Sequence, residues 1–136
     1  MTTHTSRTLK YLRDLDFHAE VIERWVINPK HPAGGFRKDY FGFGDILAFN
    51  HDGHRDQTLL VQSCGSGFSE HRRKMLEIDE IMAWTISPTR RVLLISWRKV
   101  KKKRGGKAMI WKPRIAEFWA YHGRVTCHEY LTETIL

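Results

Sequence analysis

FGFGDILAF (residues 41–49) and TLLVQSC (residues 58–64) are the two stretches that decide the fold of this chain. Both are apolar runs of strand length, and each carries one polar residue of an unexpected kind, Asp45 in the first and Gln62 in the second. If the two strands pair, the Asp45 carboxylate and the Gln62 amide oxygen come together, and such oxygens bind hard divalent cations. The alternative is that both are hydrogen-bonded polar residues of the core.

Around this pair, the chain predicts further strands and helices. Ser6 can cap a helix in which Leu9, Leu12 and Leu15 share one face. Strands are predicted at residues 17–27, 40–49, 58–64, 91–97 and 110–121 and again after 122–123, and a second helix at about 69–84. Turns are predicted at residues 28–35 and 50–57. This order predicts a single α/β domain over residues 1–136, with a mixed central β-sheet flanked by helices.

Length and composition are those of one globular domain, because 136 residues with 41% hydrophobic content can bury a core. No apolar run is long enough to span a bilayer, and the first residues do not form a signal peptide. Cys64 and Cys127 lie far apart, and we expect free thiols in a reducing compartment. We therefore expect a cytoplasmic protein, in the host cytoplasm if it is encoded by a phage, with no membrane partner.

The positive charge of the chain is concentrated in a basic loop at residues 98–107. This loop has no acid and seven basic residues, Arg98, Lys99, Lys101, Lys102, Lys103, Arg104 and Lys107. Subtracting these seven from the net charge of +8 leaves +1 for the rest of the chain. We expect the loop to bind nucleic acid, with Trp97 and Trp111 placed on either side to stack on bases or sugars. The alternative is a solvated loop without a partner.

The sequences GFGDILA (residues 42–48) and LVQSCG (residues 60–65), within the predicted order of elements, resemble the PD-(D/E)xK nuclease superfamily. Within it, the chain is most similar to archaeal-type Holliday-junction resolvases and small phage-encoded relatives, over about residues 6–97. The resemblance implies a restriction-endonuclease-like αβββαβ core. It also implies a Mg²⁺-dependent DNA endonuclease in which Mn²⁺ can substitute.

Carried over to this sequence, the resemblance implies that Asp45 and Gln62 are metal ligands, with the Ser63 backbone carbonyl as a third. Two positions depart from the family pattern. Cys64 stands where the family has lysine, and residues 6–15 contain no glutamate. We expect Glu23 to supply the missing acid, with Glu20 as the weaker choice.

The missing cation is expected from the start of the second helix. Lys74 is the first choice there, and its neighbours Arg72 and Arg73 are expected to contact nucleic acid. The alternatives are a surface ion pair for Glu23 and a solvated helix face for Lys74.

Two functions follow from these expectations. The first is a Mg²⁺-dependent endonuclease acting on DNA, including branched or Holliday-junction DNA, in which case a homodimer would cut paired strands symmetrically. The second is a catalytically degenerate protein of the same fold that binds DNA or RNA without cleaving it. A weaker third is a basic protein that binds RNA or an acidic protein through residues 98–107.

Overall fold

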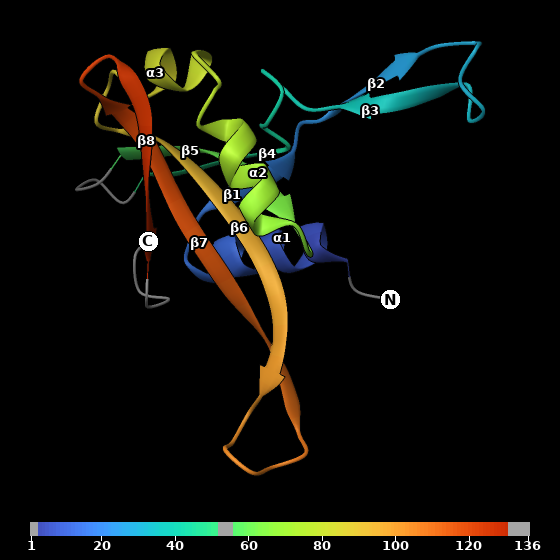
Figure 1. The fold of residues 1–136 in the computed structure, drawn as a ribbon, viewed down its shortest axis with the longest axis vertical. Coiled ribbons are helices and arrows are strands. Elements are labelled where there is room, and N and C mark those ends of the chain that lie inside the picture. Colours follow the sequence, from blue (N-terminus) through green and yellow to red (C-terminus); the bar gives the residue numbers. More distant parts are fainter. Residues whose placement is uncertain (1–2, 52–55, 131–136) are drawn as a thin grey trace.

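The computed structural model describes residues 3–51 and 56–130 (Figure 1). It shows an α/β domain with one mixed six-stranded sheet, in the order β1-β4-β5-β6-β7-β8, and a separate two-stranded sheet, β2-β3. The elements in chain order are α1 (His4–Asp14), β1 (His18–Val21), β2 (Arg24–Ile27), β3 (Gly35–Lys38), β4 (Ile46–His51), β5 (Asp56–Cys64), α2 (Phe68–Met75), α3 (Glu80–Trp84), β6 (Arg90–Lys101), β7 (Met109–Tyr121) and β8 (Arg124–Tyr130).

The pairing of β5 makes it a central strand of the six-stranded sheet. It runs antiparallel to β4 and parallel to β6, whereas the other pairs in the six-stranded sheet are antiparallel. Parallel neighbours need a crossover between them, and α2 and α3 provide it.

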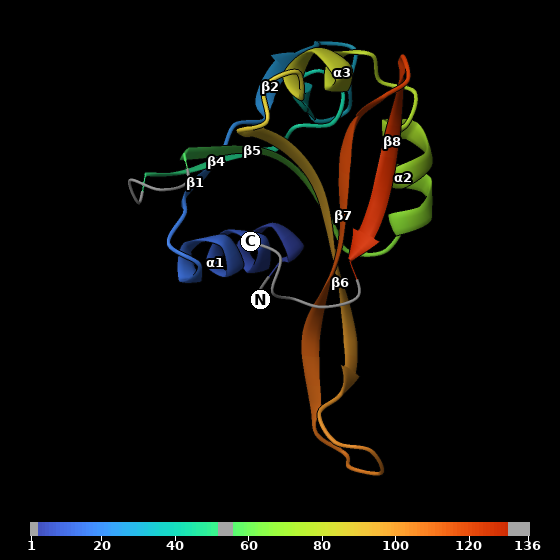
Figure 2. The same cartoon turned by 90° about the vertical axis from the view of Figure 1, so that its left-hand side faces the viewer.

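Helices cover both faces of the sheet, and the core has two halves accordingly (Figure 2). Successive residues of β5 point to opposite faces, so that Leu59 and Val61 join the half beneath α1 while Leu60 and Cys64 join the half beneath α2 and α3. Among the described residues, no helix has the length and apolar character needed to cross a membrane. Both cysteines are free, as expected.

Several predicted boundaries are wrong. The first helix is capped by Thr3 rather than Ser6, and the Thr3 Oγ1 accepts a hydrogen bond from the Ser6 backbone N–H at 3.1 Å. The predicted strand 17–27 is two strands in two different sheets, β1 and β2. The predicted strand 40–49 becomes β4 only at Ile46, immediately after Asp45. The loop predicted at 50–57 is shorter, since β4 and β5 extend into it, and its 52–53 turn lies outside the described residues.

The predicted helix 69–84 is also divided in two, α2 and α3. Met75 and Ile81 are both buried in the same half of the core. Residues six positions apart lie about 120° apart around a continuous helix, so one straight helix would not bury both as fully. The break between them lets each of the two helices present its own apolar residue to the sheet.

Two hairpins project from the domain (Figure 1). The longer one is formed by β6 and β7, whose pairing continues to Lys101 and Met109, while the pairing of β6 with β5 ends at Ser96. We call residues 97–112 the basic arm. Because β6 extends to Lys101, the first part of the predicted basic loop at 98–107 is strand rather than loop. The shorter projection is the β2–β3 hairpin.

Candidate functional site

Three carboxylates converge where the chain leaves the six-stranded sheet for the β2–β3 hairpin. One oxygen from each of Glu23, Asp39 and Asp45 can be chosen so that all three lie within 4.8 Å of one another, close enough to hold one metal ion. Glu23 immediately precedes β2 and Asp39 immediately follows β3. Since Arg24 pairs with Lys38 in the hairpin, the next positions outward, Glu23 and Asp39, lie opposite each other at its base.

A tight turn brings Asp39 back to Asp45. Tyr40 and Gly44 pair through two backbone hydrogen bonds of 2.8 Å, so the residues on either side of that pair face each other. The turn requires a left-handed backbone at Phe41, with φ 55°, and at Gly42, with φ 82°. Glycine adopts this conformation without steric cost, which makes Gly42 the residue that permits the turn.

Asp45 is buried, with 5% of its surface exposed, and the backbone of β5 holds its carboxylate. The Ser63 N–H donates to Asp45 Oδ1 at 3.1 Å, and Gln62 Nε2 donates to Asp45 Oδ2 at 3.2 Å. Gln62 also donates to the Ser63 carbonyl oxygen at 3.4 Å. Asp45, Gln62 and Ser63 therefore lie together as predicted, but the Gln62 amide nitrogen rather than its oxygen faces Asp45, and the Ser63 carbonyl accepts from Gln62.

Burial and the neighbouring carboxylates raise the pKa values of Asp45 and Asp39. Burial, with the nearby charge of Asp39 as the next cause, raises the pKa of Asp45 to about 8. Burial and the charge of Glu23 likewise raise the pKa of Asp39. Arg37 lies beside this group and donates to Glu23 Oε1 at 2.8 Å. A divalent cation would offset the repulsion among these carboxylates.

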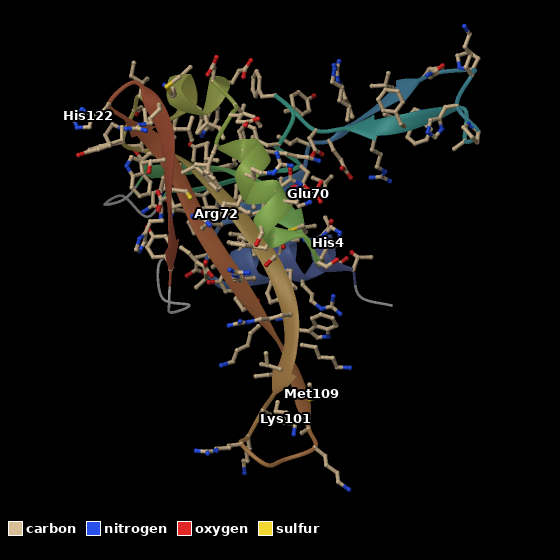
Figure 3. The ribbon with its side chains drawn as sticks, viewed as in Figure 1. His4, Glu70, Arg72, Lys101, Met109 and His122 are labelled. Carbon is tan, nitrogen blue, oxygen red and sulfur yellow. The ribbon has the colours of Figure 1, made fainter. Side chains whose placement is uncertain are left out.

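These acids line an open cleft of about 480 Å³ together with Gln62 and Ser63. Two histidines, His4 and His71, also line it, from α1 and α2 respectively. His4 Nδ1 lies 3.3 Å from Ser63 Oγ, and burial lowers the pKa of His4. Figure 3 labels His4 at the start of α1, close to α2.

The predicted site residues divide into two groups. Asp45, Gln62, Ser63 and Glu23 meet in the cleft. Lys74 is absent from its described lining, and it lies on the exposed side of α2 in an ion pair with Glu70 at 3.4 Å. This geometry does not place Lys74 in the predicted role of the missing lysine.

The remaining helix cations also lie apart from the cleft. Arg72 donates to Cys127 Sγ at 3.2 Å, on the side of α2 that faces β8, and Arg73 is exposed. Cys64 reaches the cleft, but burial raises its pKa to about 11, so it stays a neutral thiol there.

Three acidic or histidine residues that line the cleft are not indicated as site residues by the sequence. They are Asp39, His4 and His71, and the helical pattern predicts a packing role for the last of these. A signal for Asp39 exists in the turn at 28–35, because an antiparallel hairpin around this turn places residues 23 and 39 opposite each other. No pattern in the sequence indicates that His4 and His71 meet at the same cleft.

A second groove lies beside the cleft, and Gly65 and Ser66 line both. Arg98 and Lys99 at the base of the basic arm also line the groove, as does Trp111. Figure 3 shows Lys101 and Met109 at the far end of this arm, away from the body of the domain. The groove therefore leads from the acids toward the basic arm.

The two tryptophans that flank the basic segment have different surroundings. Trp97 is 9% exposed and donates from its indole N–H to Thr8 Oγ1 at 2.8 Å, so its ring belongs to the core and has little surface left for stacking. Trp111 is 43% exposed, and the guanidinium of Arg7 lies 3.8 Å from the centre of its ring. Of the two, Trp111 has the exposure needed to stack on a base.

The raised pKa of Asp45 predicts how stability depends on pH when no divalent cation is present. The pKa of the Asp45 carboxyl is about 8 in the folded protein and about 4 in the unfolded chain. Between these values the folded state binds the extra proton, so the free energy of unfolding should fall as the pH rises from about 4 to about 8. Urea unfolding in EDTA measures this slope, and Asp45→Asn should flatten it. An equal slope in both proteins would contradict the assignment to Asp45.

Comparison of the chain with known protein families, with curated proteins and with solved structures finds no match.

Proposed function

We propose that the protein is a divalent-cation-dependent DNA endonuclease, with the three-carboxylate cleft as its active site. The observation that carries this proposal is the convergence of Glu23, Asp39 and Asp45 beside Gln62 on a central strand. The resemblance of the surrounding sequence to PD-(D/E)xK nucleases supports the same conclusion. Mg²⁺ is the proposed cofactor, with Mn²⁺ as its substitute.

The residues of the cleft fit such an ion by size and by chemistry. Mg²⁺ takes oxygen ligands at about 2.1 Å, so ligands on opposite sides of the ion lie about 4.2 Å apart. One oxygen from each of the three carboxylates lies within 4.8 Å of the other two, so the side chains must draw closer together for all three oxygens to reach one ion. Burial first, and then the charge of Asp39, raise the pKa of Asp45, so a cation beside it would stabilise the ionised carboxylate that these two effects disfavour.

Each group of the chain has a proposed task in phosphodiester hydrolysis. When bound, the ion polarises a phosphoryl oxygen and eases deprotonation of the attacking water. Asp45 is held rigidly by the Ser63 N–H, so it can anchor the ion in a fixed position. Glu23 and Asp39 complete the carboxylate set, and the Gln62 amide orients Asp45 through their hydrogen bond.

The basic arm is proposed to hold the DNA. Its Arg98 and Lys99 line the groove that adjoins the cleft, so a strand that contacts them passes close to the carboxylates. Five further cations of the arm lie farther out and are exposed, where they can contact phosphates of the same DNA: Lys101, Lys102, Lys103, Arg104 and Lys107. Branched DNA is the proposed preferred form, and cutting both strands of a junction would need two copies of the site in a symmetric dimer.

Incubation of the protein with branched, nicked and linear DNA tests the proposal. Cleavage is expected in Mg²⁺ and in Mn²⁺, with none in EDTA, because the carboxylates alone cannot activate water at a phosphodiester. Denaturing gel electrophoresis of end-labelled strands measures the products. Absence of cleavage on every substrate, in either metal, would overturn the proposal.

A second candidate function is binding of DNA or RNA without cleavage. It is favoured by one observation: no lysine or arginine is among the described residues that line the cleft, and Cys64 occupies the family's lysine position as a neutral thiol. Tight, salt-sensitive binding together with the absence of cleavage would establish this function instead. Competition between DNA, RNA and heparin would identify the preferred polyanion.

A further inference from the structure

The β2–β3 hairpin has the composition of a nucleic-acid-binding surface. Residues 24–38 contain four basic residues and no acidic residue. They also expose large apolar side chains, with Trp25 at 54%, Phe36 at 38% and Ile27 at 79%. Exposed apolar side chains among cations mark a surface that contacts a partner.

One face of the hairpin leads directly out of the carboxylate cleft. Trp25 and Arg37 are cross-strand partners and therefore share a face. Glu23 lies two residues before Trp25 and accepts a hydrogen bond from Arg37 at 2.8 Å, which places it at the inner end of that same face. A nucleic-acid strand that follows this face meets Trp25 and Arg37 immediately before it reaches the carboxylates.

The indole of Trp25 packs against the backbone of the neighbouring strand, β3, at Gly35. Gly35 has no side chain, and a Cβ built there would lie 2.7 Å from Trp25 Nε1 and 2.4 Å from the Val26 carbonyl oxygen. The indole therefore rests against the Gly35 backbone while more than half of the residue stays exposed. A ring held in this way loses little conformational entropy when a base stacks on it.

We propose that the β2–β3 hairpin is a second DNA-binding element that holds an unpaired strand, with one base stacked on Trp25 and a phosphate beside Arg37. The inference rests on the proposed function, because it takes the cleft at the base of the hairpin as the place where the strand is cut. The basic arm and the hairpin then contact the substrate on two different sides of the cleft. This arrangement selects DNA that has unpaired bases next to the cut, as branched DNA with a single-stranded segment does and a fully paired junction does not.

The charge of the hairpin favours nucleic acid over a second copy of this chain as the occupant. Residues 24–38 carry four basic residues and no acidic residue, so two copies of the hairpin would bring like charges together without an acid within the hairpin to pair with them, and like charges repel. The phosphodiester backbone of nucleic acid carries the opposite charge, and an exposed indole offers the stacking platform that unpaired bases use.

Fluorescence anisotropy in EDTA tests the inference with a labelled single-stranded oligonucleotide and with the duplex of the same sequence. Base–aromatic stacking predicts that Trp25→Ala weakens binding of the single strand by about fivefold to a hundredfold, with a smaller effect on the duplex. Trp25→Phe should retain most of the affinity, because a phenyl ring still stacks. Tyr121→Ala is the matched control, since Tyr121 is 58% exposed at the far end of β7 and should leave binding unchanged.

A charge variant keeps the test valid if Trp25→Ala disturbs the hairpin, which circular dichroism would reveal. Lys30→Glu at the hairpin tip should lower the magnitude of the log–log salt slope for the single strand by about 0.7 or more. Arg124→Glu, on β8, is its control, because it changes the net charge equally and should leave the slope at its wild-type value. Wild-type binding by both Trp25→Ala and Lys30→Glu would overturn the inference.

Two further outcomes separate this inference from the proposed function. Loss of single-strand binding in Trp25→Ala, in a protein that cleaves no DNA, supports the inference and overturns the nuclease. Cleavage of DNA by the wild-type protein, together with normal single-strand binding by the Trp25 variants, supports the nuclease and overturns the inference. Conversion of a dimer to a monomer by Trp25→Ala, measured by sedimentation with DNA affinity unchanged, would mean that the surface binds a second copy, and this would also overturn the inference.

Discussion

Replacement of Asp45 by asparagine should abolish metal-dependent cleavage while leaving DNA binding in EDTA intact. Divalent cations contribute several kcal/mol to phosphodiester hydrolysis, so loss of the buried ligand should lower the cleavage rate on the order of a thousandfold or more. Asparagine keeps the shape of the side chain, and its amide oxygen can still accept from the Ser63 N–H. The variant should therefore fold, and single-turnover cleavage of labelled DNA measures the loss.

Thermal unfolding gives a second measurement on the same variant. Added Mg²⁺ should raise the melting temperature of the wild-type protein, because the ion binds the folded state, and it should raise that of Asp45→Asn much less. Glu20→Gln is the control, since Glu20 is an exposed carboxylate on β1 outside the cleft. Cleavage at the wild-type rate by Asp45→Asn would refute the nuclease, whatever the outcome for Glu20.

The part of the site that could be predicted comes from strands that are neighbours in both sequence and space. The predicted strands of Asp45 and Gln62 are connected by a short loop, so they are expected to meet. In the structure Asp45 immediately precedes β4 and its carboxylate lies 3.2 Å from the Gln62 amide nitrogen on β5. Glu23 is expected nearby on the ground that its strand lies beside that of Asp45. Glu23 does lie near Asp45, but not for the predicted reason. It lies between β1 and β2, where the chain passes from one sheet to the other, rather than within a strand beside Asp45.

Asp39 could not be found by treating residues 40–49 as one strand. An extended chain rises about 3.3 Å per residue, which would carry residues 39 and 45 about 20 Å apart. The turn at Phe41 and Gly42 reverses the chain instead, so that both carboxylates reach the same point. The apolar pattern does not indicate this reversal, because phenylalanines favour a strand, and a bulky residue such as Phe41 adopts the left-handed backbone of the turn only at a steric cost.

The sequence likewise does not indicate which part of the basic arm is strand and which part is loop. A run of lysines and arginines indicates solvation, and solvated strands and solvated loops have the same composition. In the structure the backbone of Arg98 to Lys101 pairs with that of Met109 to Lys112, so this part of the arm is strand although it has no buried face. Helix α1 shows the opposite case, because the burial of Leu12 in the core follows directly from its apolar periodicity.

Neutralisation of the outer basic arm should remove most of the salt dependence of DNA binding. The variant replaces Lys101, Lys102, Lys103, Arg104 and Lys107 by glutamine. Removal of one phosphate contact lowers the magnitude of the log–log salt slope for duplex DNA by about 0.9, so five such contacts account for about 4.5. Through these contacts the affinity of the wild-type protein should fall on the order of several hundredfold between about 50 and 200 mM salt, and that of the variant should fall far less. Anisotropy titrations at several salt concentrations measure both slopes.

A pair of double variants separates the role of the arm from that of net charge. Lys102→Gln with Lys103→Gln removes two charges from the arm, and Lys10→Gln with Arg124→Gln removes two exposed charges from α1 and β8. If the arm grips the DNA, the first pair should flatten the slope by nearly two units and the second should leave it close to the wild-type value. Equal slopes would contradict a DNA-binding arm and would assign the effect to the overall charge. Stability cannot account for a difference, because the pairing of β6 with β5 ends at Ser96 and the neutralised residues are exposed beyond the core.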